Sequence, residues 1–128
     1  MTVTYVIDGA EVTGLDRFWQ VIGAAVNGPG GYFGRNLDSL ADCLRGGYGT
    51  PDDGDFAVEW RAHEASRQAL GHEETARVVR RRLERAHPDN GPALRAQLAE
   101  AEAGRGPTVF EELTQLFEEE APGVLRLR

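Results

Sequence analysis

Two aspartates four residues apart are the acidic side chains of this chain best placed to act together. Asp38 and Asp42 follow Asn36 in a stretch whose apolar residues recur at helical spacing, namely Leu37, Leu40, Ala41 and Leu44. Side chains four apart on a helix share one face, so both carboxylates are expected to point the same way. Such carboxylates can accept charge-assisted hydrogen bonds from arginine, lysine or histidine, as phosphate oxygens do. The pair therefore indicates a surface that binds a basic partner.

The position of each acid in this short helix separates a structural role from a functional one. Asn36 can cap the first turn, because its side-chain oxygen can accept from the backbone N–H groups exposed there. Asp38 lies in that turn, where the helix dipole favours a negative charge. Asp42 lies near the C-terminal end, where the dipole disfavours it. This placement favours a functional role for Asp42.

Other patterns of reactive residues are incomplete. Two His-Glu dipeptides, beginning at His63 and His72, start like a zinc-protease motif. The position of the second histidine is occupied by Arg67 in one and by Ala76 in the other. The chain has no lysine, so P-loop and Schiff-base chemistry are excluded, and its single Cys43 is expected to be a small buried hydrophobe. We expect a protein that is not an enzyme and holds no metal or cofactor.

Length and composition predict one domain spanning 1–128. The 128 residues are 41% hydrophobic, which is enough to build a core. One cysteine allows no intramolecular disulfide. The first residues carry no basic, apolar leader, and no apolar run is long enough to span a membrane, so we expect a cytoplasmic protein without membrane contact. The free protein is expected to be monomeric.

The net charge of −7 is unevenly spread. Residues 1–60 carry nine acids against three arginines, whereas residues 61–105 carry nine arginines against seven acids. An acidic surface repels nucleic acid and attracts a basic partner, although the same balance also keeps a protein in solution. Nucleic-acid binding by the helix around Arg77–Arg85 is the alternative, but the same helix carries Glu73, Glu74 and Glu84. No nucleic-acid partner is expected.

The elements that must position these residues follow from the apolar periodicity. Strands are expected at 3–7, 56–60 and 124–127, and the first is expected to be buried on both faces. Helices are expected at about 15–26, 37–44, 61–69, 73–86, 93–103 and after Thr108, with caps at Thr13 and Thr108. Strands separated by helices cannot pair as hairpins. The order therefore predicts an α/β fold, in which helices flank a three-stranded parallel sheet.

The segment from Gly31 to Leu44, GYFGRNLDSLADCL, resembles the signature of the barstar family. That signature has an aromatic pair, a glycine, a variable residue, Asn-Leu-Asp, and then Leu-x-Asp-Cys-Leu. The strand that ends at Ile7-Asp8-Gly9 and the strand that precedes the helix at 61–69 agree in order and spacing. The likeness covers about residues 3–70 and resumes weakly over 110–127. It implies a three-stranded parallel sheet with helices packed around it.

The resemblance implies an intracellular inhibitor of a guanyl-specific, barnase-like secreted ribonuclease, a basic microbial protein. In this family the second helix and the loop before it block the nuclease active site. Tyr32 matches the aromatic residue that stacks against the catalytic region, and Asp38 matches an acid at its basic rim. Asp42 matches the acid that enters the phosphate pocket, and Gly46 belongs to the same contact surface.

Several positions depart from the family pattern or match it loosely. Ala41, within the contact surface, stands where the best-known member has a tryptophan, and Arg35 replaces a common acid. Glu119, or else Glu118, is the nearest match to a further acidic contact in the last helix. The region 71–107 is longer than the family norm and is expected to be a helical insertion. An immunity protein for a different nuclease toxin, or a barstar-like interaction module, is therefore the alternative function.

Overall fold

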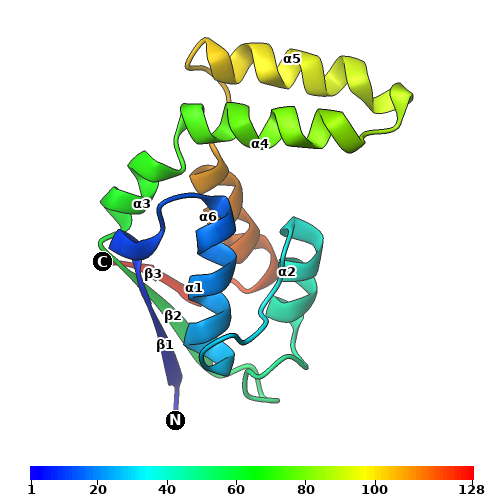
Figure 1. Cartoon of the computed structure of the whole chain (residues 1–128). Helices are drawn as coiled ribbons and strands as arrows, with labels where there is room; N and C mark the ends of the chain where they lie inside the picture. Colours follow the sequence, from blue (N-terminus) through cyan, green and yellow to red (C-terminus); the bar gives the residue numbers. More distant parts are fainter.

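A parallel sheet with six α-helices forms the fold of the computed structural model, which describes all 128 residues (Figure 1). The strands β1 (Val3–Asp8), β2 (Phe56–Arg61) and β3 (Leu125–Leu127) lie in the order β1-β2-β3, and both pairs are parallel. The helices are α1 (Leu15–Asn27), α2 (Leu37–Arg45), α3 (His63–Ala69), α4 (His72–Arg85), α5 (Gly91–Glu102) and α6 (Val109–Glu120). Short 3-10 turns cover Gly9–Glu11 and Pro88–Asn90. The predicted α/β fold with three parallel strands is confirmed.

The edge strand β1 is buried on one face only, so the expected burial on both faces is wrong. Ile7 is fully buried against the helices, whereas Thr4 is exposed and Val6 is 40% exposed on the opposite face. The central strand β2 is buried at Phe56, Ala57, Val58 and Trp60. Apolar residues alone did not distinguish the edge strand from the central one, because the strand order is a property of the whole sheet.

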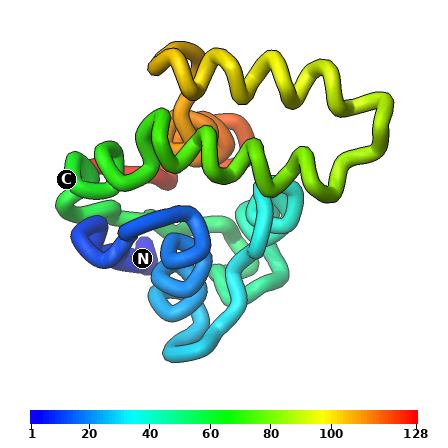
Figure 2. The backbone as a smooth tube through the Cα atoms, turned by 45° about the horizontal axis from the view of Figure 1, so that its top comes forward, coloured from blue at the N-terminus to red at the C-terminus, as the bar shows by residue number.

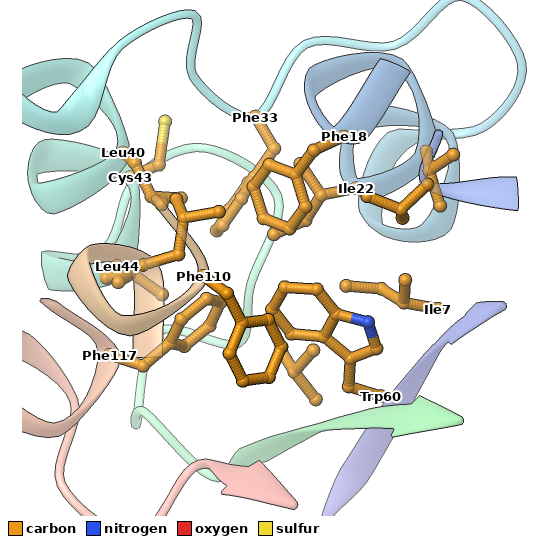
Figure 3. Close-up of a cluster of buried hydrophobic side chains, with 14 of the residues drawn as sticks. Ile7, Phe18, Ile22, Phe33, Leu40, Cys43, Leu44, Trp60, Phe110 and Phe117 are labelled. Carbon is orange, nitrogen blue, oxygen red and sulfur yellow. The ribbon is translucent and has the colours of Figure 1, made fainter. Parts of the chain in front are cut away.

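Trp60 lies at the centre of the core (Figure 3). Its ring stacks on Phe18 of α1 at 5.2 Å between centroids and meets the edge of Phe110 of α6 at 5.3 Å. The indole Nε1–H donates to the Ser66 hydroxyl at 2.9 Å, and this hydroxyl donates to the Gly9 carbonyl at 2.8 Å. The buried polar atoms of this contact are therefore paired, which removes the cost of burying them. One side chain thus joins α1, α3 and α6 to the sheet.

The first helix begins differently from the expected Thr13 capping box. Its N-cap is Gly14, which has no side chain to bond the first turn. Glu74 of α4 performs this role instead, because its carboxylate accepts from the Leu15 N–H at 2.8 Å. The same carboxylate accepts two bonds from Arg77, at 2.6 and 2.7 Å. A residue distant in the sequence therefore caps α1 and ties it to α4.

Two other helices begin at the expected caps. Asn36 Oδ1 accepts from the Ser39 N–H at 2.8 Å, and Ser39 Oγ accepts from the Asn36 N–H at 3.0 Å. Thr108 and Glu111 form the same reciprocal pattern at the start of α6. These capping boxes satisfy backbone donors that each first turn leaves free. The caps predicted at Asn36 and Thr108 are confirmed.

Helices α4 and α5 form a hairpin that extends beyond the sheet and its covering helices (Figures 1 and 2). Val78 and Val79 of α4 are buried, and Thr75 Oγ1 accepts from the Val109 N–H at 2.9 Å. Helix α4 is therefore anchored to α6. Helix α5 buries only Gly91 and Ala101, so it is held chiefly by α4. None of the six helices combines the length and apolar character that a membrane crossing needs.

Candidate protein-binding surface

Helix α2 places its two aspartates outward. Leu40, Cys43 and Leu44 face the core, where Leu40 lies near Phe33 and the α6 side chains (Figure 3). Asp38 and Asp42 are exposed, as the spacing of four residues predicts. The apolar face of a short helix thereby fixes the direction in which both carboxylates point.

A single amide joins the loops on either side of α2. Asn27, the last residue of α1, donates through Nδ2 to the carbonyl of Tyr32 and to that of Tyr48, each at 2.7 Å. Tyr32 precedes α2 and Tyr48 follows it. Gly49 permits this approach: a β-carbon there would lie 2.1 Å from Asn27 Oδ1, and its φ of 113° is in the left-handed region. Asn27 therefore fixes both loops relative to α1.

Two aromatic side chains stand exposed beside the acidic helix. Tyr32 is 41% exposed and Tyr48 46% exposed, and their ring centroids are 6.2 Å apart. The guanidinium carbon of Arg35 lies 5.9 Å from the Tyr32 centroid, within cation–π range. Tyr32 therefore has surface available for a partner, and so has Tyr48, which the sequence did not single out. An aromatic residue between glycines, as in Gly47-Tyr48-Gly49, is the signal that could have revealed it.

Arg45, at the end of α2, lies between two acids. Its Nη1 donates to Asp42 Oδ1 at 2.9 Å, and its Nε and Nη2 donate to the two carboxylate oxygens of Glu120 at 2.8 and 3.0 Å. The hydrogen bond from Arg45 lowers the pKa of Glu120, and the same contact raises the pKa of Arg45. Asp42 is 60% exposed, and its Oδ2 makes no hydrogen bond within the chain. Arg45 thus orients Asp42 while one carboxylate oxygen faces outward.

The glutamates at the end of α6 point in different directions. Glu119 is exposed and accepts from Gln115 of its own helix at 2.8 Å, and Glu118 lies beside β3. The residue brought to Asp42 is Glu120, which the sequence analysis did not select. Its spacing from the buried Phe117 is the signal that could have found it, because residues three apart share a helix face.

Ala41 is largely covered in the free protein, and its expected place in the contact surface stays a prediction. It is only 6% exposed, because it lies four residues after Leu37 on the packed side of α2, so it offers a partner almost no surface. Gly46 ends the helix with a φ of 123°, and a β-carbon there would meet no atom within 4 Å. The glycine is therefore required by backbone conformation, and the space around it is open to a partner.

Cys43, His63 and His72 have structural roles: the cysteine is buried, and the two histidines bond the backbone. Cys43 is buried, as expected, and burial raises the pKa of its thiol, with a further contribution from the charge of Asp42. Ring nitrogens of His63 and His72 lie 2.7 and 2.9 Å from backbone carbonyls. No group of three or more His, Cys, Asp or Glu side chains is close enough to hold a metal ion.

The fold and this surface define a small α/β protein that presents an acidic helix between two loops held in place. A family model described as Barstar (barnase inhibitor) matches residues 2–99, and the chain belongs to this family. A search of curated proteins gave no match. The matched range runs from β1 into α5 and stops before α6 and β3, so the weak likeness expected over 110–127 lies outside it. Whether 71–107 is an insertion relative to the family stays a prediction.

Proposed function

We propose that this protein inhibits a guanyl-specific, barnase-like ribonuclease by covering its active site with α2 and the adjoining loops, and that it catalyses no reaction. The observation that carries the proposal is the exposed Asp42, held by Arg45 in the half of α2 where the helix dipole disfavours it. A charge placed against the dipole contributes little to helix stability. Its position is explained by a partner that supplies positive charge.

The chemistry of a ribonuclease cleft fits this surface. A site that binds RNA phosphates gathers arginine, lysine and histidine, which donate to carboxylates as well as to phosphates. The free oxygen of Asp42 can accept from such a group, and Asp38 can bind a cation at the rim of the cleft. Tyr32 and Tyr48 supply aromatic contact area beside the acids, the combination typical of binding hot spots. The proposed contact surface consists of Tyr32, Asp38, Asp42, Gly46 and Tyr48, with Glu119 at its margin.

Titration of barnase, followed by other guanyl-specific microbial ribonucleases, tests the proposal. The wild-type protein is expected to abolish RNA cleavage at a one-to-one ratio. Asp42→Ala is expected to weaken inhibition by at least about 30-fold, since truncating a buried interfacial charge costs about 2 kcal/mol or more. Asp89→Ala is the matched control, because Asp89 is an exposed acid on the distant α4–α5 hairpin.

Two results would contradict the proposal. If the wild-type protein leaves every ribonuclease of the panel active at about micromolar concentration, the inhibitor function is wrong. If Asp42→Ala and Asp89→Ala inhibit equally well, the assignment of the contact surface to α2 and its loops is wrong.

A nuclease toxin outside the barnase class is the second candidate partner, with this chain as its immunity protein. Arg35 and Arg45 favour it, because both place positive charge within the acidic surface. A partner that matches them carries acids among its basic residues. The same titration with a nuclease encoded beside this chain's gene distinguishes the two candidates.

A further inference from the structure

A basic groove lies where α1, the start of α2 and α4 meet; Figure 2 shows α4 passing close to both. Its volume is about 220 Å³. The apolar residues that line it are Leu15, Trp19, Leu37 and Val78. The charged residues that line it are Arg35, Arg77, Arg81, Arg82, Arg85 and Asp16. Five arginines around an apolar floor are unexpected in a protein of net charge −7.

The basic groove adjoins a second hollow that reaches the proposed inhibitory surface at Tyr32. Trp19 and Arg35 also line a neighbouring hollow of about 560 Å³, which includes Tyr32 and Arg17 and contains no acidic residue. The two hollows are therefore neighbours that share Trp19 and Arg35 as a wall, and together they reach from Tyr32 to α4. A protein seated on α2 and Tyr32 would lie directly beside the entrance of the groove.

The arginines of the groove already hold carboxylates of this chain. Arg81 binds Asp16 at 3.0 Å, whereas Arg77 and Arg82 pair with glutamates of α4 and α6 at 2.6 and 3.8 Å. Arg35 and Arg85 form no ion pair in the chain. The groove thus has the geometry to bind carboxylates and leaves two guanidinium groups at its wall for further ones.

Charge and shape favour an acidic peptide over a nucleic acid. An oligonucleotide carries a charge on every phosphate and would be repelled by the acidic remainder of the chain. Because three of the five arginines are already paired, little positive charge is left for a polyanion. A peptide segment can place one or two carboxylates on Arg35 and Arg85 and an apolar side chain on Trp19 and Val78.

The size of the proposed inhibitory surface also favours a partner contact that extends into the groove. Helix α2 and its loops span residues 32–48, whereas a stable protein interface uses roughly 20–30 residues a side. The contact must therefore extend onto neighbouring elements. The hollow lined by Tyr32 adjoins the inhibitory surface and is the next surface available.

We infer that the basic groove binds an acidic peptide segment of the partner protein, with its carboxylates on Arg35 and Arg85. The inference rests on the proposed function only in assigning this segment to the protein that also covers α2. Helix α4 then helps to select the partner, because the partner must present a basic cleft to α2 and an acidic segment to the groove.

The two tryptophans allow a direct test. Trp19 lines the groove, whereas Trp60 is buried and bonded to Ser66, so the two indole N–H signals in a ¹⁵N–¹H spectrum report on different places. The probe is a short peptide of glutamates around one leucine, titrated at low ionic strength beside its glutamine counterpart. The glutamate peptide is expected to shift the Trp19 signal, leave that of Trp60 unchanged, and lose affinity as salt is added.

Charge-reversal variants locate the binding site. Arg35→Glu/Arg85→Glu is expected to weaken binding of the glutamate peptide by at least about tenfold, since charge-assisted bonds are replaced by repulsion. Arg95→Glu/Arg126→Glu changes the net charge equally at exposed positions outside the groove and is expected to bind as the wild type does. Circular dichroism checks that both variants are folded.

Three results would overturn the inference: no shift of Trp19 with the glutamate peptide, an equal shift with the glutamine peptide, or a larger shift with an oligoribonucleotide of the same length. The last would identify a nucleic-acid site instead. These measurements need no ribonuclease. If the peptide binds but no nuclease is inhibited, the proposed function is wrong, whereas the inference that the groove binds an acidic peptide holds.

Discussion

At the scale of single residues, ion pairs and burial determine how the acidic side chains bind cations and how they affect stability. Arg45 bonds Asp42 and Glu120 at once, so a partner's cation meets the free oxygen of Asp42 beside an internal cation. Glu112 differs from these two acids, because burial raises its pKa and Arg82, 3.8 Å away, only partly opposes this. One ionised glutamate inside the α4–α6 contact is therefore a cost to folding at neutral pH.

Glu112→Gln is expected to increase the free energy of unfolding at pH 7 by up to about 1 kcal/mol. The raised pKa means that the folded state holds the proton more tightly than the unfolded one. The contribution of Glu112 is thus fully present below the pKa of an ordinary glutamate and is lost as the pH rises through its folded pKa. The stability gain of the variant should accordingly disappear in acid.

Urea unfolding of wild type and Glu112→Gln across the acid-to-neutral range measures this effect. Glu118→Gln is the control, because Glu118 is exposed on the same helix. Destabilisation by Glu112→Gln at pH 7 would show that the Arg82 pair outweighs the cost of burial.

At the scale of elements, α2 is held by its neighbours as well as by its own cap. Its capping box sets where the helix begins, whereas Asn27 sets where the loops before and after it lie. These loops carry the exposed rings of Tyr32 and Tyr48. A binding surface made of one short helix and two loops needs this tether, since ordering loops on binding costs affinity.

Asn27→Ala is expected to lower the free energy of unfolding by about 1–2 kcal/mol, because two backbone carbonyls lose their donor. Affinity for an inhibited ribonuclease should fall by about tenfold, since the freed loops must be ordered on binding. Chemical unfolding and inhibition constants measure the two effects. Asn90→Ala is the control, because the Asn90 side chain makes no capping bond. Unchanged inhibition by Asn27→Ala would show that the loops do not contribute to binding.

At the scale of the whole molecule, charge is separated between two regions. The segment 1–60 is strongly acidic, whereas α4 places arginines around the basic groove. In the proposed complex the acidic region would attract a basic protein over long distances, and the groove would add a local requirement for acids on that protein. Together they would give specificity that an evenly acidic surface would lack.

The association rate with an inhibited ribonuclease is expected to fall by about tenfold or more between about 10 mM and 500 mM salt, because salt screens the attraction between unlike charges. The dissociation rate should change much less. Stopped-flow fluorescence measures both rates. Asp42→Ala is the comparison, since this variant should lose affinity mainly through a faster dissociation rate. An association rate independent of salt would contradict the steering role of the acidic region.

Local signals made much of the fold predictable. Apolar periodicity located the strands and helices, and the side chains of Asn36 and Thr108 marked where α2 and α6 begin. The four-residue spacing of Asp38 and Asp42 placed both on the exposed face of α2. These features depend on residues within one or two helical turns, so the sequence alone determined them.

Contacts between distant segments were decided only by the tertiary structure. The cap of α1 comes from Glu74, and the acid beside Asp42 is Glu120 of α6, because packing brings these helices together. The outer face of β1 is exposed because the strand lies at an edge, and Ala41 is covered because of how α2 packs. The sequence by itself determined the acidic helix and its family. The arrangement of neighbours around that helix depends on long-range packing, which no short stretch of sequence encodes.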